Sequence, residues 1–318
     1  CRSTGHSNAL MDTSRITSGD YLPLLADTNE VEQTVYDSEL QSITSDGFTV
    51  GTQPHAGGDG KTYVGYGWKA NGGSRTTFTE SGDNPGGGYQ ANTTSGFSII
   101  DYTGTGQTAG DPALVPHGLG VAPSFIIVKQ KDAVRDWNVF HHKNTSAPET
   151  DFLVLNSTDA TADASNRWND TMPNATNVVL GDTARVNDDA GSYIMYAFAE
   201  KQGYSKFGSY TGNGNADGPF VYTGFKPAWL LAKRSNSTGD WILVDGTRNT
   251  SNPTYLTVKP NSDAPEITSE YWIVDFLSNG FKVRLTDAEM NGNGDTIIYM
   301  AFAESPFVSS DGVPATAR

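Results

Sequence analysis

GSYIMYAFAEKQGYSKFGSYTGNG, residues Gly191 to Gly214, is the stretch that decides the fold. Between Tyr193 and Phe198, alternate side chains fall on opposite faces of a β-strand, and both faces are apolar. A Lys-Gln-Gly turn then leads into a second strand, which ends at a Gly-Asn-Gly segment because these residues accept positive φ at little cost. We therefore expect a strand covered on both sides, at the boundary between two structural units.

Both halves of this stretch recur elsewhere in the chain. AFAE at Ala197–Glu200 returns at Ala301–Glu304, and YTG at Tyr102–Gly104 returns at Tyr210–Gly212. Nearly all matched segments lie 103 or 104 positions apart. Further matched pairs with this spacing are Ala122–Lys129 with Lys226–Lys233, Asp136-Trp137 with Asp240-Trp241, Phe152–Leu155 with Tyr255–Val258, and Arg167-Trp168 with Tyr271-Trp272. This register predicts two copies of one fold.

A third, partial copy occupies the beginning of the chain. Its matched segments are Tyr21–Leu24 with Phe152–Leu155, Ser45–Val50 with Ser278–Val283, and Tyr66–Ala70 with Tyr196–Glu200. It lacks the YTG segment and the strand that opens with proline, an aromatic residue and an apolar run. Cys1 therefore falls inside a unit. Either the chain is a fragment of a longer protein, or its first half-unit comes from elsewhere, or this is an eroded repeat with a processed N-terminus.

Composition favours an all-β fold of tandem β-sandwich or jelly-roll-like units of about 105 residues. The chain has 318 residues and 35 glycines, and its apolar segments are short and alternating, with turn residues between them. The expected parts are a truncated β unit at 1–70, a Gly/Ser/Thr-rich linker or long loop at 71–95, β-sandwich units at 96–200 and 201–308, and a polar tail at 309–318.

The formal net charge of −15 disfavours binding to the phosphate backbone of nucleic acids and to anionic membrane surfaces. No apolar run approaches 18 residues, so we expect no membrane insertion. The single cysteine, Cys1, excludes an internal disulfide and cysteine-type metal clusters.

Several motifs together resemble a repeat family of tailed-bacteriophage structural proteins, especially those of marine and cyanobacterial phages. The segments that carry the resemblance are Ser45–Gly51, Tyr63–Ala70, Thr93–Ile100, His117–Pro123, Gly203–Gly214 and Phe276–Val283. The resemblance covers about residues 20–308. It implies a tail-fibre-like or virion-surface protein in contact with other virion proteins, and it supplies no catalytic residues.

Candidate catalytic and metal-binding residues are scattered. His141-His142 has no counterpart in the following unit, and a strand-end role is the alternative to a general base. Acidic residues at 111, 170, 188 and 189 leave open a paired-acid glycosidase. Asn213–Asp217 and Asn291–Asp295 place oxygen ligands at alternate positions, which suits calcium, although Asn-Gly turns are the alternative. We expect no other cofactor and no metal site.

Four tryptophans recur in register. Trp137 and Trp241 are expected to fill equivalent cores. Trp168 and Trp272 lie in more polar surroundings, and stacking on sugar rings is an alternative to packing there. They are the candidate carbohydrate-binding residues.

These patterns favour a non-enzymatic virion structural protein, such as a tail fibre or particle-surface fibre, that contributes to host attachment and binds a surface glycan. The alternative is a polysaccharide-degrading tailspike or a secreted carbohydrate-binding protein. Apolar residues on both strand faces predict a cyclic homo-oligomer, with a trimer favoured.

Overall fold

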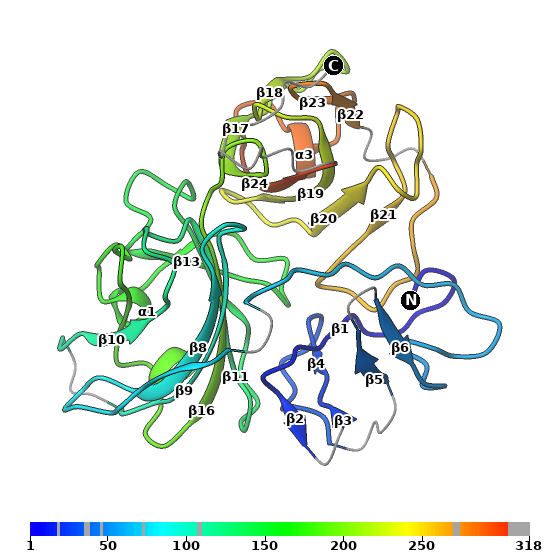
Figure 1. Ribbon diagram of the computed structural model, residues 1–318. Helices are drawn as coiled ribbons and strands as arrows, with labels where there is room; N and C mark the ends of the chain where they lie inside the picture. Colours follow the sequence, from blue (N-terminus) through cyan, green and yellow to red (C-terminus); the bar gives the residue numbers. More distant parts are fainter. Residues whose placement is uncertain are drawn as a thin grey trace.

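The computed structural model describes residues 1–304 apart from 18–19, 35–38, 45–46, 72–73, 107–109 and 270–273. Three units lie around a common centre (Figure 1). We call them unit 1 (residues 1–70), unit 2 (74–200) and unit 3 (201–304). The expected polar tail at 309–318 lies outside the described residues.

Unit 2 is a sandwich of an eight-stranded antiparallel sheet and a two-stranded one. The large sheet has the spatial order β14-β13-β12-β11-β16-β9-β8-β7, and β10 pairs with β15 over its outer face. The strands are β7 (Thr76–Phe78), β8 (Gly86–Asn92), β9 (Phe97–Thr103), β10 (Ala113–Pro116), β11 (Phe125–Gln130), β12 (Asn138–His141), β13 (Asp151–Val154), β14 (Ala162–Asp163), β15 (Asn177–Leu180) and β16 (Ser192–Phe198). The helices are α1 (Ser165–Trp168) and α2 (Ala184–Asn187).

Unit 3 repeats this arrangement. Its main sheet has the order β17-β24-β19-β20-β21, which matches β9-β16-β11-β12-β13 of unit 2 strand for strand. A second sheet, β18-β23-β22, covers the outer face together with α3 (Ala288–Asn291). The strands are β17 (Ser205–Thr211), β18 (Phe220–Tyr222), β19 (Pro227–Arg234), β20 (Trp241–Asp245), β21 (Thr257–Val258), β22 (Val274–Leu277), β23 (Gly280–Val283) and β24 (Thr296–Ala303). The all-β prediction, with repeated sandwich units, is confirmed.

Among its described residues, unit 1 contains only short strand pairs. In it β1 pairs with β4, β2 with β3 and β5 with β6. The strands are β1 (Ala9–Leu10), β2 (Ile16–Thr17), β3 (Asp20–Tyr21), β4 (Leu24–Leu25), β5 (Leu40–Ile43) and β6 (Phe48–Val50). Residues 62–69, which overlap the segment aligned with Tyr196–Glu200, form no strand.

Two apolar cores cover the two faces of the β16 strand. Ile194, Tyr196 and Phe198 face a central core shared by all three units, whereas Tyr193 and Met195 face the outer core of unit 2. The outer core of unit 3 forms a third cluster. Strand β16 is therefore covered on both sides within one chain, and its apolar character does not require a second copy.

The prediction that the segment 71–95 is a linker or a long loop was wrong. Strands β7 and β8 within it form a hairpin that extends the main sheet of unit 2, with Gly86–Asn92 paired along Phe97–Thr103. Glycine disfavours strands in general, but here it permits close approach. A Cβ on Gly87 would lie 2.1 Å from the carbonyl oxygen of Asp101.

Candidate functional site

Each unit contacts the next through the same kinds of side-chain and backbone hydrogen bonds. We call each of these junctions between units a seam. The Trp137 indole Nε1–H donates to the carbonyl oxygen of Leu25 at 3.0 Å, and that of Trp241 donates to the carbonyl oxygen of Val154 at 3.0 Å. Both side chains are buried. The predicted core role of this pair is confirmed, and the structure adds that each tryptophan joins its unit to the preceding one.

Two buried lysines repeat at the same seams. Lys129 donates to the carbonyl oxygens of Asn29 and Gln130, and Lys233 donates to those of Thr158 and Arg234. Burial lowers the pKa of each ammonium group to about 8.

Backbone hydrogen bonds also repeat at the two seams. Arg135 N–H donates to the carbonyl of Asn29, as Gly239 N–H does to that of Thr158. The donor residues of the two seams lie 104 positions apart in the sequence, and the acceptor residues lie 129 positions apart. An offset of 129 positions makes Leu24 of unit 1 equivalent to Leu153 of unit 2. The sequence alignment of Tyr21–Leu24 with Phe152–Leu155 was therefore wrong by two positions, because a shift of two residues preserves the alternation of a strand and leaves the apolar pattern matched.

Unit 3 meets unit 1 at a third seam of the same type, with a different residue in the tryptophan position. By the 129-residue register, Asn8 is equivalent to Trp137. Its side-chain amide donates to the carbonyl oxygens of Lys259 and Ser262 at 3.0 and 2.9 Å, where Trp137 donates to those of Leu25 and Thr28. The three units therefore close into a ring with approximate threefold symmetry.

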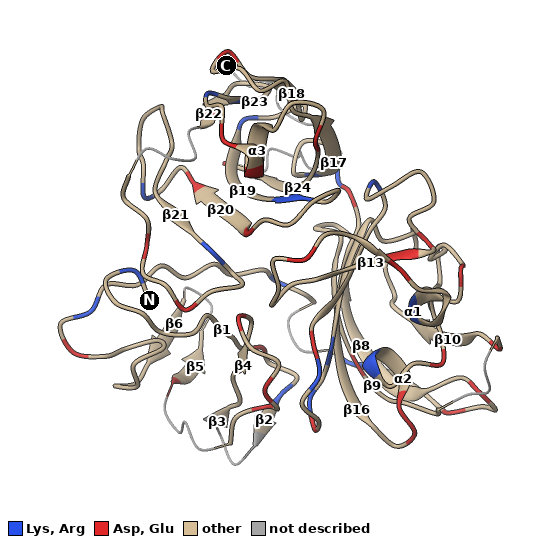
Figure 2. Cartoon of the chain, turned by 180° about the vertical axis from the view of Figure 1, so that it is seen from behind, with Lys and Arg blue, Asp and Glu red and all other residues tan. Residues whose placement is uncertain are grey.

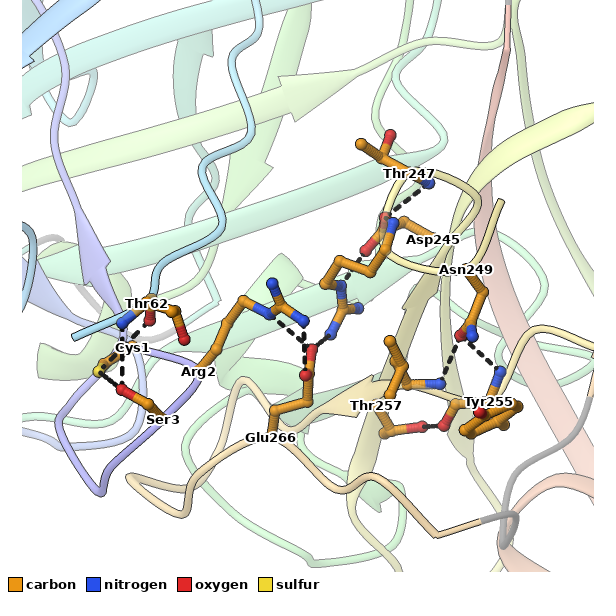
Figure 3. Close-up of polar contacts among 12 residues, drawn as sticks. Cys1, Arg2, Ser3, Thr62, Asp245, Thr247, Asn249, Tyr255, Thr257 and Glu266 are labelled. Carbon is orange, nitrogen blue, oxygen red and sulfur yellow. Dashed lines mark hydrogen bonds and ion pairs between the residues drawn. The ribbon is translucent and has the colours of Figure 1, made fainter. Parts of the chain in front are cut away.

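An ion-pair network reinforces the third seam (Figure 3). Glu266 accepts from Arg2 at 2.9 and 2.8 Å and from Arg248 at 2.6 Å, and Arg248 also pairs with Asp245. The Tyr66 hydroxyl donates to Asp245 at 2.7 Å. Burial opposes ionisation of Asp245, but Tyr66 and Arg248 outweigh it and lower the pKa of this carboxyl group.

Asp12, His141 and Asp245 occupy one equivalent position in the three units. Each accepts a hydrogen bond from the backbone N–H two residues later. Asp12 also accepts from the Tyr196 hydroxyl at 2.6 Å, as Asp245 does from that of Tyr66. His141 instead bonds the carbonyl oxygen of Tyr299 at 3.1 Å through Nε2.

The histidine pair therefore has a structural place at the seam of units 2 and 3. Burial lowers the pKa of His141 to about 3, which keeps its ring neutral. His142 Nε2 bonds the carbonyl oxygen of Phe207 at 2.9 Å. Both rings bond backbone groups, which corresponds to the strand-end interpretation.

Trp168 is not a sugar-binding residue, and that interpretation was wrong. Its side chain is 1% exposed, packs edge-on against Phe140 at 5.8 Å, and donates Nε1–H to the carbonyl oxygen of Asp151 at 3.0 Å. On the one-turn helix α1, its polar neighbours Ser165 and Asn166 are exposed, whereas Arg167 is buried over the ring of Phe152. Trp272, the other candidate, lies outside the described residues.

The two Asn-Gly segments lie against each other as turns. The side-chain oxygen of Asn213 accepts from the backbone N–H of Asn215, and that of Asn291 accepts from Asn213 N–H. Asp217 is paired with Lys282 at 2.7 Å. Within the described residues, no three His, Cys, Asp or Glu side chains are grouped to hold a metal ion.

The outer sheet of unit 3 exposes two aromatic side chains that sequence reasoning missed. Phe220 is 46% exposed and Tyr222 is 65% exposed, on the solvent face of β18. Lys282 is the cross-strand partner of Phe220, and Gly280 that of Tyr222. We call Phe220, Tyr222, Gly280, Lys282 and Asp275 the aromatic platform. In the sequence, Phe220 and Tyr222 alternate with Val221, which is buried. This alternation could have predicted that the two aromatic side chains share the opposite, exposed face of the strand.

Charged groups border these rings. Asp275 lies opposite Lys282 on the next strand, and it pairs with Arg284 at 2.8 Å. Acidic side chains are also spread over loops of all three units (Figure 2). The aromatic platform thus combines an apolar surface with hydrogen-bonding groups at its edge. The equivalent strand of unit 2, β10, instead carries half-buried Leu114 and Pro116 beside a shallow groove of about 220 Å³.

A second polar cluster that the sequence did not reveal lies in unit 1. The carboxylate of the fully buried Glu39 accepts a hydrogen bond from His55 Nδ1 at 2.6 Å, and the ring of His6 lies 6.0 Å from that of His55. Distant positions in the sequence supply these residues, so their grouping follows only from the fold.

The fold and seams define the protein as a closed ring of three related β units. The chain belongs to the family described as a domain of unknown function, DUF7483, whose model matches residues 1–306 and so spans all three units. No curated protein and no solved structure matched significantly. Among the described helices, none is long and apolar enough to cross a membrane.

Proposed function

We propose that this chain is a non-enzymatic structural protein of a phage particle surface and that it contributes to host attachment by binding a glycan through the aromatic platform. The motif resemblance supports the virion assignment. The exposed Phe220 and Tyr222 carry the binding assignment.

The chemistry of the platform suits a carbohydrate. The C–H-rich face of a pyranose ring packs on an aromatic face, while its hydroxyl groups bond charged side chains at the edge. Gly280 opposite Tyr222 has no side chain to occupy the space beside the ring. Lys282 and Asp275 then supply a donor and an acceptor on the same face.

The test is binding of the purified chain to an array of bacterial capsular polysaccharides and lipopolysaccharides. Phe220→Ala and Tyr222→Ala should each weaken binding to a recognised glycan by about 1–3 kcal/mol, the scale of an interfacial anchor. Met172→Ala is the matched control, because Met172 is 41% exposed on unit 2. Equal binding by all three variants, or no binding to any glycan, contradicts the proposal.

Turnover is tested with the same glycans. Mass spectrometry should find no released oligosaccharide after prolonged incubation. Release by the wild-type chain that is abolished by substituting an acidic pair would establish the glycosidase alternative instead.

A further inference from the structure

Basic side chains extend the aromatic platform along strand β23. Phe281 and Val283 are buried in the outer core of unit 3, so the residues that alternate with them face outward. Two of these outward residues are Lys282, opposite Phe220 on β18, and Arg284, which directly follows the strand. One face of the sheet β18-β23-β22, on the outer side of unit 3 (Figure 1), therefore presents aromatic rings next to two cations.

The Phe220 ring lies across this face over a glycine. A Cβ on Gly280 would lie 3.1 Å from Phe220 Cε2, so the ring leans over β23 at the one residue without a side chain. The Phe220 side chain nevertheless remains 46% exposed. An exposed aromatic ring held in this way can stack on the apolar face of a sugar.

The backbone holds the Lys282 ammonium group beside the rings. Its Nζ donates to the carbonyl oxygen of Gly218 at 3.0 Å and pairs with Asp217 at 2.7 Å. The Asp217 side chain is 89% exposed, and an ion pair with so exposed a partner adds little stability. A ligand carboxylate can therefore replace Asp217 while the Gly218 carbonyl keeps the ammonium group in place.

The Arg284 guanidinium group has hydrogen-bond donors to spare. Its Nη1 pairs with Asp275 at 2.8 Å, and among the described residues Asp275 is the one hydrogen-bond partner of this group. The Arg284 side chain is 49% exposed, against 16% for Asp275, so a ligand on this face meets the guanidinium group rather than the carboxylate. A guanidinium group can bind a carboxylate through two parallel N–H···O bonds.

We propose that the glycan bound by the aromatic platform is acidic, with uronic acid residues whose carboxylates bind Lys282 and Arg284 while the pyranose ring stacks on Phe220. This inference rests on the proposed function and names the class of its ligand. A uronic acid carries its carboxylate directly on the pyranose ring, so a single sugar presents an apolar face and a charged edge together. The platform presents the complementary pair of surfaces.

Charge at long range works against an anionic ligand, since the formal net charge of the chain is −15. At physiological ionic strength, however, the screening length is about 8 Å, so acidic side chains on distant loops act weakly on a bound carboxylate. The two carboxylates that border the platform, Asp217 and Asp275, are each paired with one of the two cations. Contact with Lys282 and Arg284 therefore decides the preference.

The probes are oligosaccharides of galacturonic, glucuronic and mannuronic acid, each compared with its carboxyl-reduced form, which is neutral and has the same linkages. In calorimetry with the full chain at about 0.15 M salt, at least one acidic oligosaccharide should bind more tightly than its reduced form by about tenfold or more, the scale of a hydrogen bond to a charged group. Equal binding of the two forms, or no binding of any acidic probe, overturns the proposal.

Arg284→Gln should weaken binding of the acidic oligosaccharide by about tenfold and leave binding of the reduced form unchanged, because glutamine keeps an amide donor but not the charge. Phe220→Ala should weaken binding of both forms. Arg75→Gln is the matched control, since Arg75 is an exposed arginine of unit 2 that pairs with Asp101, and it should bind as the wild type does. Circular dichroism checks that each variant is folded.

Asp217→Asn should have the opposite effect and tighten binding of the acidic oligosaccharide by about twofold to fivefold, because it removes the carboxylate that competes for Lys282. A purely structural ion pair predicts no such gain. If Phe220→Ala loses binding while Arg284→Gln and Asp217→Asn bind as the wild type does, the platform binds a glycan without recognising its charge; this inference then fails and the proposed function stands. If Phe220→Ala binds both forms as tightly as the wild type does, the proposed function fails as well.

Discussion

Trp168 illustrates how a side chain can be buried in a polar stretch of sequence. Ser165, Asn166 and Asn169 surround it, but one turn of helix places its indole in the outer core of unit 2. Trp168→Ala should therefore lower the free energy of unfolding by about 3–5 kcal/mol through the cavity left behind. Denaturant titration measures this.

Met172→Ala, at an exposed position nearby, should change the same quantity by no more than about 0.5 kcal/mol. A Trp168→Ala variant that is fully stable but has lost glycan binding would restore the original interpretation of this residue.

His141 predicts a loss of stability in acid. Its pKa is about 3 in the folded state, because of burial, while the unfolded chain titrates near the ordinary value of about 6.5. The unfolded state then binds more protons between these values, so stability falls as pH drops from about 6.5 towards 3. We expect this residue to account for about 2 kcal/mol between pH 6.5 and pH 5.

The comparison variant is His141→Asn. Asparagine retains an acceptor for the Lys143 N–H, as aspartate does at the equivalent positions 12 and 245, but it does not titrate. The variant should show a shallower dependence of unfolding free energy on pH. Parallel curves for variant and wild type would exclude His141 as the source.

At the scale of elements, Gly87 in the β7–β8 hairpin allows strand β8 to lie close to strand β9. Gly87→Ala would place a methyl group against the Asp101 carbonyl, so we expect destabilisation of about 1–3 kcal/mol by overpacking. Hydrogen exchange along β8 and β9 should accelerate. Gly47→Ala, where no atom lies within 4 Å of the added carbon, is the control. An unchanged exchange rate in Gly87→Ala would show that β8 does not hold this register in solution.

At the scale of the whole molecule, the seams lie within one chain. Trp241→Ala removes a buried indole from the central core and from the contact with Val154, so it should destabilise the chain by about 3–5 kcal/mol. Because the seam is internal, the mass of the particle in light scattering should not change. A change in mass would mean that this tryptophan joins separate chains.

The cyclic homo-oligomer, with a trimer favoured, stays a prediction, although the apolar faces of β16 that motivated it are covered within one chain. Light scattering at micromolar concentration should give a mass about three times that of one chain. A monomeric mass would contradict it.

The sequence by itself determined the β class and the repeat that makes units 2 and 3 copies of one fold, because alternation and a near-constant register are local and periodic signals. Only the tertiary structure decided that Asn8 takes the tryptophan position, that Asp12 is equivalent to His141 and Asp245, and that Trp168 is buried while Tyr222 is exposed. These outcomes depend on which distant segments meet at a seam or cover a face. Neighbouring residues in the sequence carry no information on that, because burial is decided by contacts made across the ring.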